Sequence, residues 1–276
     1  MALFECKLFS SELFRSVNVN VTLPLPDSNN QFFDSSPKYP KENQKFQVLW
    51  LLHGISADES DWQRFSCIER YAQLNNVAVV MPDGYNSMYT NSRFGAKYFN
   101  YYTQELPAML RSIFPLSDKR EDNFIAGLSM GGYGAFKAAF TYPENYCAAV
   151  SLSGGVDIDV MLGKRDRKSG IPSVEWGQNV FGEDFKDFDF ERDDLKSLLK
   201  ADIASGKTLP ALYMSIGTED FLYDSNQDFR KFLTDQKVEF TYDEGPGLHN
   251  FDFWDPQIRK VLDWLPLNHD FSVHTN

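Results

Sequence analysis

The sequence contains few cysteines and no long hydrophobic run. Its three cysteines, Cys6, Cys67 and Cys147, are far apart, form none of the close pairs typical of zinc sites, and lie in apolar surroundings. We therefore expect reduced, buried thiols rather than disulfide bridges. No apolar run approaches the ~20 residues that cross a bilayer, and Glu5 and Lys7 interrupt the stretch where a secretory signal peptide would be apolar. These features predict a cytoplasmic protein that does not span a membrane.

Basic residues are also scarce relative to acidic ones. The chain has 27 lysines and arginines against 39 aspartates and glutamates, which gives a formal net charge of −12. Binding to nucleic acid depends on neutralising phosphates, so we expect no nucleic-acid partner. Attraction to an anionic membrane surface is disfavoured for the same reason.

What the sequence does have is a regular alternation of short apolar runs and helical patterns. Nearly continuous apolar runs are typical of parallel strands whose two faces are covered by helices. The expected strands are 46–52, 77–81, 123–128, 147–152, 209–216 and 238–242. The expected helices are 61–74, 99–114, 130–141, 226–235 and 256–265, and Pro107 should kink or restart the second of them. Residues 8–23 alternate in hydrophobicity and should add antiparallel edge strands. We predict one α/β domain, residues 1–276, with a mostly parallel sheet and helices on both faces.

Two segments depart from this alternation. Residues 26–44 are rich in proline, asparagine, serine and aspartate and should form an exposed loop. Residues 155–206 mix charges with Trp176, Phe181 and several other phenylalanines, and they follow a strand end, where ligands bind in open α/β sheets. We interpret this second segment as an inserted cap in which Trp176 and Phe181 help to form an apolar substrate pocket. Packing of these aromatic side chains into the core is the alternative.

The pentapeptide Gly127-Leu128-Ser129-Met130-Gly131 follows an apolar run and opens an alanine-rich helical run. A strand that turns sharply into a helix strains the backbone of the central serine, and the flanking glycines let neighbouring strands approach. Ser129 is therefore the candidate nucleophile. A glycine-rich turn in an ordinary α/β protein is the alternative that the pattern alone leaves open.

A serine hydroxyl needs an imidazole to take its proton and a carboxylate to orient that imidazole. In α/β-hydrolases these residues follow the nucleophile in the order acid, histidine. The acid candidates come after the strand 209–216, where we choose Asp220, with Glu219 as the close alternative. His249 lies in a loop before the final helix and is the candidate base, whereas His269 and His274 lie in a polar C-terminal tail.

His53-Gly54-Ile55-Ser56 ends the first expected buried strand, where this architecture supplies a backbone donor to an oxyanion hole. The N–H groups of Ile55 and Met130 could converge on a developing oxyanion, aided by the positive end of the helix that begins at Met130. His53 is expected to hold this loop by a hydrogen bond, and it is also a candidate substrate contact. No partner for His53 lies at the spacing of a metal ligand.

These motifs together resemble the esterase D family of α/β-hydrolases, in particular its bacterial tributyrin-esterase and acetyl-esterase branch. The matching residues span nearly the whole chain and comprise Leu51 to Gly54 with Trp62, Phe124 to Gly134, Gly217 to Tyr223, Trp176 to Glu183, and His249 with Trp254. The resemblance implies the α/β-hydrolase fold, a triad of Ser129, Asp220 and His249, and oxyanion donors at Ile55 and Met130. S-formylglutathione hydrolases and feruloyl esterases are related, but the former typically carry a Ser-Gly-Leu-Thr-Cys type sequence where this chain has His53 to Ala57.

We therefore expect a serine carboxylesterase that hydrolyses short acyl esters, from acetyl to butyryl, or hydroxycinnamoyl esters through an acyl-enzyme. Hydrolysis of the thioester S-formylglutathione, or acyl transfer to an alcohol by the same triad, is the alternative. The chemistry requires no metal or cofactor. A small-molecule ester is the expected partner, and the resemblance is compatible with a homo-oligomer.

Overall fold

The computed structural model describes residues 1–26, 40, 42–92, 95–157 and 174–268 of the 276-residue chain. One sheet contains eight strands in the order β1-β2-β4-β3-β5-β6-β7-β8. The β1-β2 and β2-β4 pairs are antiparallel and the other pairs are parallel, which confirms the mostly parallel sheet. The strands are β1 (Ala2–Ser10), β2 (Arg15–Leu23), β3 (Val48–Leu52), β4 (Ala78–Pro82), β5 (Asn123–Leu128), β6 (Ala148–Leu152), β7 (Ala211–Gly217) and β8 (Thr241–Gly245).

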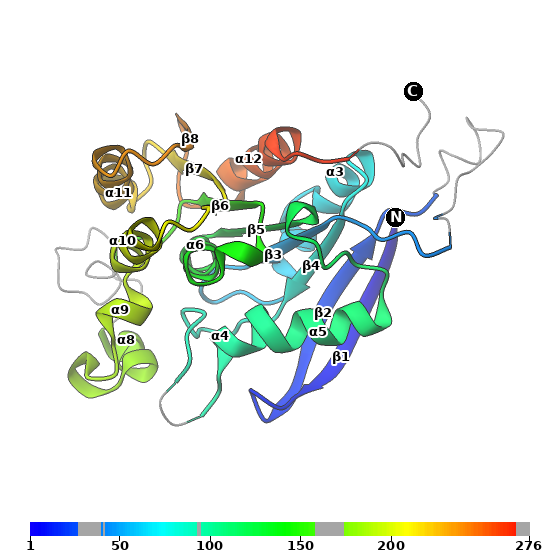
Figure 1. Ribbon diagram of the computed structural model, residues 1–276, viewed down its shortest axis with the longest axis horizontal. Coiled ribbons are helices and arrows are strands. Elements are labelled where there is room, and N and C mark those ends of the chain that lie inside the picture. The colour runs from blue at the N-terminus through cyan, green and yellow to red at the C-terminus, as the bar shows by residue number, and fades with distance from the viewer. Residues whose placement is uncertain (27–39, 41, 93–94, 158–173, 269–276) are drawn as a thin grey trace.

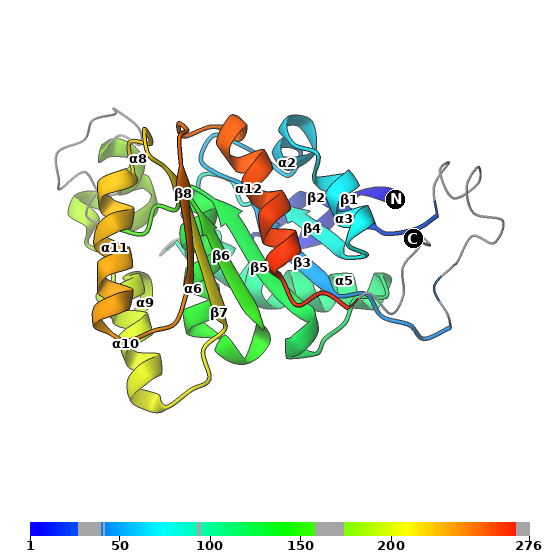
Figure 2. The same ribbon diagram turned by 90° about the horizontal axis from the view of Figure 1, so that it is seen from above.

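Helices cover both faces of the sheet (Figures 1 and 2). One face packs against α2 (Asp61–Phe65), α3 (Ile68–Leu74) and α12 (Phe251–Trp264). The other face packs against α4 (Tyr98–Asn100), η1 (Tyr101–Glu105), α5 (Leu106–Ile113), α6 (Met130–Thr141), α10 (Leu195–Ser205) and α11 (Tyr223–Asp235). Short 3-10 turns lie at η2 (Arg120–Asp122) and η3 (Pro143–Asn145). The central strands are therefore buried on both sides, as their continuous apolar sequences predict.

Several predicted boundaries differ from the observed ones. The helix predicted over 99–114 contains the π-helical turn η1 just before Pro107, which has no N–H to bond the carbonyl four residues earlier. The last strand was expected at 238–242 but is Thr241–Gly245. Val238 and Phe240 pack against the core before the strand begins. Their apolar character therefore led to a strand being predicted too early in the sequence.

The connection from β6 to β7 carries α8 (Val174–Phe181), η4 (Glu183–Phe185), α9 (Phe190–Asp193) and α10. Asp194 caps α10 by accepting the N–H of Ser197 at 2.8 Å, and Gly206 ends the helix in a left-handed conformation. Part of the predicted cap, residues 158–173, lies outside the described residues, as does most of the predicted loop 26–44.

Candidate active site

Ser129 lies at the turn between β5 and α6 with φ 54° and ψ −118°, a conformation that residues with a side chain rarely adopt. The flanking glycines make this turn possible. A β carbon added at Gly127 would lie 2.3 Å from the carbonyl of Gly131, and one added at Gly131 would lie 2.5 Å from the carbonyl oxygen of Leu52. Backbone therefore packs directly on backbone around a serine that is 7% exposed.

The structure brings Ser129, His249 and Asp220 together. The His249 Nε2 atom lies 2.9 Å from the Ser129 Oγ atom. On the other side of the ring, Nδ1 lies 2.8 and 3.0 Å from the two carboxylate oxygens of Asp220. The Asp220 side chain is completely buried, and its Oδ1 also accepts the N–H of Leu222 at 2.8 Å. A carboxylate on Nδ1 places a proton on that nitrogen and leaves Nε2 free to accept one from the serine.

Glu219, the alternative acid, faces another way. Its carboxylate accepts the backbone N–H of Gly247 at 2.6 Å and the hydroxyl of Thr218 at 2.8 Å. The bond from Gly247 is the main reason that the pKa of this exposed carboxyl is lowered. The Glu219 N–H in turn donates to the Gly247 carbonyl at 3.2 Å. Glu219 thus clamps the loop that carries His249 and does not contact the imidazole.

Aromatic side chains flank the imidazole of His249. The ring of Phe221 lies 4.5 Å away between centroids, and that of Trp254 lies 4.8 Å away in an edge-to-face arrangement. Trp254 is held in turn by a hydrogen bond from its Nε1 to the Ser153 Oγ atom at 3.0 Å. These contacts leave the His249 side chain 16% exposed and restrict the positions that its ring can take.

The backbone amides of Ile55 and Met130 lie beside the serine turn. Met130 is the first residue of α6, so its N–H has no partner within the helix. The loop that carries Ile55 approaches closely, because a β carbon added at Gly54 would lie 2.6 Å from Leu128 and 3.4 Å from the Ser129 β carbon. Within the described part of the chain, neither amide donates to a backbone carbonyl. The two amides therefore remain the predicted oxyanion donors.

His53 lies behind this loop, 1% exposed. Its Nδ1 lies 2.6 Å from the Gly54 carbonyl, and its Nε2 accepts the N–H of Gly84 at 2.8 Å. Burial lowers the pKa of the ring, so the neutral form is favoured. Because both nitrogens are engaged by backbone, the structure does not support the prediction that His53 contacts substrate; the ring joins the loops after β3 and β4.

The two aromatic residues predicted to form a pocket differ in their surroundings. Phe181 is 1% exposed, belongs to the core and packs edge-to-face on Phe188 at 5.3 Å between centroids. Its predicted role as a pocket wall is therefore wrong, and the alternative of core packing describes it. Trp176 is partly buried against the same core.

The structure contains a buried ion pair that the sequence did not predict. The Lys137 Nζ atom on α6 lies 2.7 Å from the Asp193 Oδ1 atom on α9, and the two side chains are 1% and 0% exposed. Thr90, in the loop after β4, accepts a hydrogen bond from Lys137 at 2.7 Å and donates one to Asp193 at 3.0 Å. Burial lowers the pKa of Lys137 to about 8 despite its anionic partner. The only signal in the sequence is a single lysine within the apolar pattern of 130–141.

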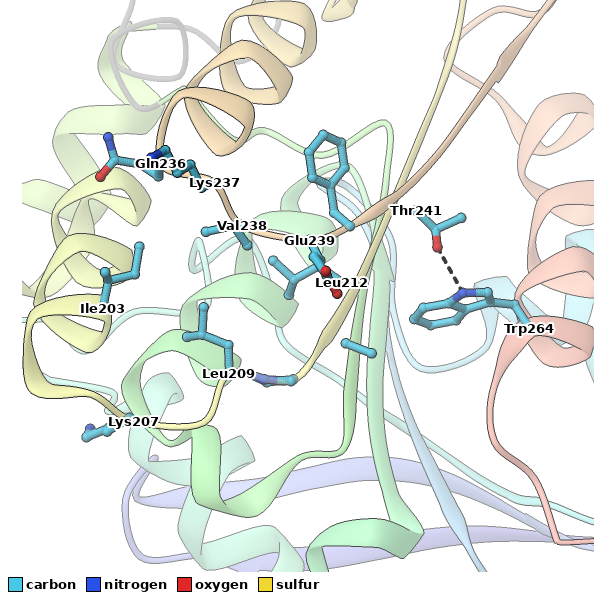
Figure 3. Close-up of a pocket in the computed structure, with 13 residues that line it drawn as sticks. Ile203, Lys207, Leu209, Leu212, Gln236, Lys237, Val238, Glu239, Thr241 and Trp264 are labelled. Carbon is cyan, nitrogen blue, oxygen red and sulfur yellow. Dashed lines mark hydrogen bonds between the residues drawn. The ribbon is translucent and has the colours of Figure 1, made fainter.

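A pocket of about 720 Å³ lies elsewhere in the molecule, and Figure 3 shows the residues that line it. It lies near the beginnings of β7 and β8, and its lining includes Leu209, Leu212, Val238 and Trp264. Ser129, Asp220 and His249 follow the carboxyl ends of β5, β7 and β8, whereas the pocket lies at the amino ends of the strands. This pocket is therefore separate from these three residues.

The described residues contain no group of three or more histidine, cysteine, aspartate or glutamate side chains arranged to hold a metal ion. They also contain no helix with the length and apolar character of a membrane span.

The α/β-hydrolase class is defined by a sheet covered by helices and by a strained serine between a strand and a helix. In this class the serine is hydrogen-bonded to a histidine, which in turn contacts a carboxylate. Comparison with known proteins assigns the family. A family model described as "Putative esterase" matches residues 10–265, and the chain belongs to this esterase family. The protein is a carboxylic ester hydrolase, which confirms the resemblance found in its motifs.

Relatives of similar length match almost end to end. The acetyl esterase of Caldicellulosiruptor saccharolyticus is 30% identical over 267 residues, which are 96% of this chain and 98% of the relative. The fluorophosphonate-binding serine hydrolase FphF of Staphylococcus aureus is 33% identical with a TM-score of 0.81, covering 96% of this chain and 98% of the other. The S-formylglutathione hydrolase FrmB of Staphylococcus aureus is 33% identical with a TM-score of 0.80 at the same coverage.

Proposed function

We propose that Ser129, His249 and Asp220 form the catalytic triad of a serine carboxylesterase that acts through an acyl-enzyme. His249 Nε2 takes the proton of the Ser129 hydroxyl as Oγ attacks the ester carbonyl carbon. The N–H groups of Ile55 and Met130 stabilise the resulting oxyanion. The imidazolium, stabilised by Asp220, then gives its proton to the leaving alcohol as the carbon–oxygen bond to the alcohol breaks.

Water completes the reaction in the second half. His249 takes a proton from water as the water oxygen attacks the acyl carbon bound to Ser129. The tetrahedral intermediate collapses, the bond to Ser129 Oγ breaks, and the proton returns to that oxygen. Free acid and the original enzyme result.

One observation carries this proposal: the His249 ring lies between the Ser129 hydroxyl at 2.9 Å and the Asp220 carboxylate at 2.8 Å. Each of these residues follows a different strand, so the contact is made only in the folded chain. General-base catalysis requires this hydrogen-bond reach.

Short acyl esters are the proposed substrates. The 30% identity to an acetyl esterase supports an acetyl group, and Phe221 and Trp254 around His249 provide apolar surface near the serine. We propose that the segment 155–206 forms a cap over the carboxyl ends of the strands, with Trp176 as the remaining candidate substrate contact. Hydroxycinnamoyl esters are the second acyl class to be tested.

The 33% identity to an S-formylglutathione hydrolase supports a second candidate, hydrolysis of that thioester. Against it stands the sequence His53 to Ala57, which departs from the Ser-Gly-Leu-Thr-Cys type of those enzymes. The same triad would attack either carbonyl, so the two candidates differ in the leaving group.

A substrate panel tests the proposal. We expect kcat/KM to be highest for p-nitrophenyl acetate or butyrate, lower for octanoate, and to exceed the values for methyl ferulate and S-formylglutathione. Ser129→Ala should fold normally and lose turnover by several orders of magnitude. Wild-type turnover in folded Ser129→Ala would reject the mechanism. A preference for S-formylglutathione would show that a thioester, and not a short acyl ester, is the substrate. Formation of a new ester when an alcohol is added would indicate acyl transfer instead.

A further inference from the structure

Strand β1 is the edge of the sheet that lies farthest from β8 (Figure 1). It pairs with β2 over nine consecutive residues, from Ala2 opposite Leu23 to Ser10 opposite Arg15, without a bulge. Among the described residues, no other strand pairs with it. Natural edge strands usually avoid pairing with another chain by being short, bulged, charged or interrupted by proline. β1 is nine residues long, has no bulge and no proline, and carries only one charge of each sign.

The side chains of β1 are unusually apolar for an exposed edge. Leu3 is 44% exposed, Phe4 38% and Phe9 59%. In the turn that follows, Phe14 is 87% exposed and contacts Phe9 edge-to-face at 6.3 Å between centroids. Charge on the strand is limited to Glu5 and Lys7, both exposed. An accessible apolar strand with unpaired backbone groups is a template for another strand.

We propose that β1 pairs antiparallel with β1 of a second copy of this chain, around a twofold axis at Cys6. Glu5 then lies opposite Lys7 of the second copy, and Lys7 opposite its Glu5. Leu3 lies opposite Phe9, and Phe4 opposite Leu8, again twice by symmetry. Directly opposite residues of an antiparallel pair share one face of the sheet, so each of these pairs is in contact. The product is one continuous sheet of two times eight strands.

The two charges select this register. Moving the axis by one residue toward the N-terminus would place Glu5 opposite Glu5 of the second copy, and moving it by one toward the C-terminus would place Lys7 opposite Lys7. Like charges directly opposite each other are destabilising, whereas opposite charges and apolar pairs are favourable. The sequence of β1 is thus complementary to itself, which is what an interface between identical copies requires.

This proposal is independent of the proposed function. Three strands, β2, β4 and β3, separate β1 from β5, which leads to Ser129. At the usual spacing between strands, β1 and β5 are about 19 Å apart. Dimerisation and ester hydrolysis can therefore be measured and can fail separately.

Charge reversal tests the interface. We expect wild type to sediment with twice the 31.7 kDa mass of the chain at micromolar concentration. Glu5→Lys and Lys7→Glu each create two like-charge pairs, and we expect each to raise the dimer dissociation constant about 30-fold. The double variant Glu5→Lys/Lys7→Glu restores opposite charges and should restore the dimer. Lys237→Glu, near β8 at the other edge, makes the same charge change as Lys7→Glu and should leave dissociation unchanged.

Analytical ultracentrifugation gives these masses, and circular dichroism shows that each variant is folded. A monomeric wild type at tens of micromolar overturns the proposal. So does a dimer that is equally stable in the single variants, since another face would then hold it. Failure of the double variant to regain the dimer would reject the register.

Cys6 offers a direct test of the axis. In the proposed register the two Cys6 residues face each other with Cα atoms about 4.5–5.5 Å apart, within the range that a disulfide spans. Copper phenanthroline under air, which removes two electrons and two protons from a pair of thiols, should rapidly link Cys67→Ser into a covalent dimer. Adding Cys6→Ser should abolish the link. Absence of a link in Cys67→Ser, or its persistence without Cys6, contradicts an axis at residue 6.

Discussion

Asp220 and Glu219 carry the same carboxylate on adjacent backbone positions but make different contacts. Asp220 is buried and meets the imidazole of His249, whereas Glu219 is exposed and holds the N–H of Gly247. Chain order and residue type leave both open as the acid. The direction of each side chain after β7 distinguishes them.

Substitution of the two acids should separate these contacts. We expect Asp220→Asn to lower kcat by about 10³- to 10⁴-fold, because an amide on Nδ1 can favour the wrong tautomer of His249. Glu219→Gln keeps an oxygen that can accept the Gly247 N–H, and it should lower kcat less than about tenfold. Steady-state kinetics with p-nitrophenyl acetate provides the measurement. Equal losses in the two variants would contradict these assignments.

His53 should make stability depend on pH. Burial lowers its pKa in the folded chain below 6.5, so as pH falls the unfolded chain takes up this proton first. The stabilisation that comes from keeping His53 neutral is fully present above pH 6.5. It is lost as pH falls toward the pKa of His53 in the folded chain. The slope is at most about 1.4 kcal/mol per pH unit.

Urea unfolding of wild type and His53→Asn between about pH 5 and pH 8 tests this effect. The variant lacks the titrating ring, so its stability should fall less steeply on acidification, whatever its absolute value. Parallel curves for the two proteins would show that His53 is not protonated differently in the folded and unfolded chains.

At the scale of elements, helix α6 connects the serine turn to the segment between β6 and β7. Met130 begins the helix beside Ser129, and Lys137, two turns later, holds Asp193 of α9 and Thr90 of the loop after β4. The Tyr133 hydroxyl donates to the Asp193 carbonyl at 2.6 Å. One helix thus positions both Ser129 and α9.

Breaking the buried pair should be costly, whereas replacing both charges should cost less. We expect Asp193→Leu to lower the free energy of unfolding by about 3–5 kcal/mol, because it leaves the buried ammonium of Lys137 without an anion. Lys137→Met should cost less, because Asp193 keeps its ion pair with Arg192 at 2.5 Å. The double variant Lys137→Met/Asp193→Leu should lose much less than the sum. A double-mutant cycle by urea denaturation measures the coupling. Additive losses would mean that the two charges do not depend on each other.

At the scale of the whole molecule, the net charge of −12 acts on charged substrates. Glutathione thioesters carry a net negative charge at neutral pH, so the field of the protein should hinder their approach at low salt. We expect kcat/KM for S-formylglutathione to rise about twofold or more between 20 mM and 300 mM NaCl, as screening shortens the range of repulsion. The value for neutral p-nitrophenyl acetate should hardly change. The same salt dependence for both substrates would point to a general effect on the enzyme.

The sequence predicts most of this architecture because strands buried on both faces need continuous apolar residues, and these are visible without coordinates. It also identifies the chain positions of Ser129, Asp220 and His249, since order along the chain follows from the fold. It fails where one residue type serves two purposes. Phe181 reads equally as pocket or core, Val238 and Phe240 as strand or packed loop, and Lys137 as a surface lysine, because burial depends on distant segments.

The backbone at Ser129 has a thermodynamic consequence. A serine held at φ 54° by its surroundings retains roughly 1–3 kcal/mol of conformational strain. Glycine would accept the same geometry with little penalty. Laboratory evolution of this chain for heat resistance alone should therefore favour glycine at position 129. Screening for turnover at the same time would be needed to retain the serine.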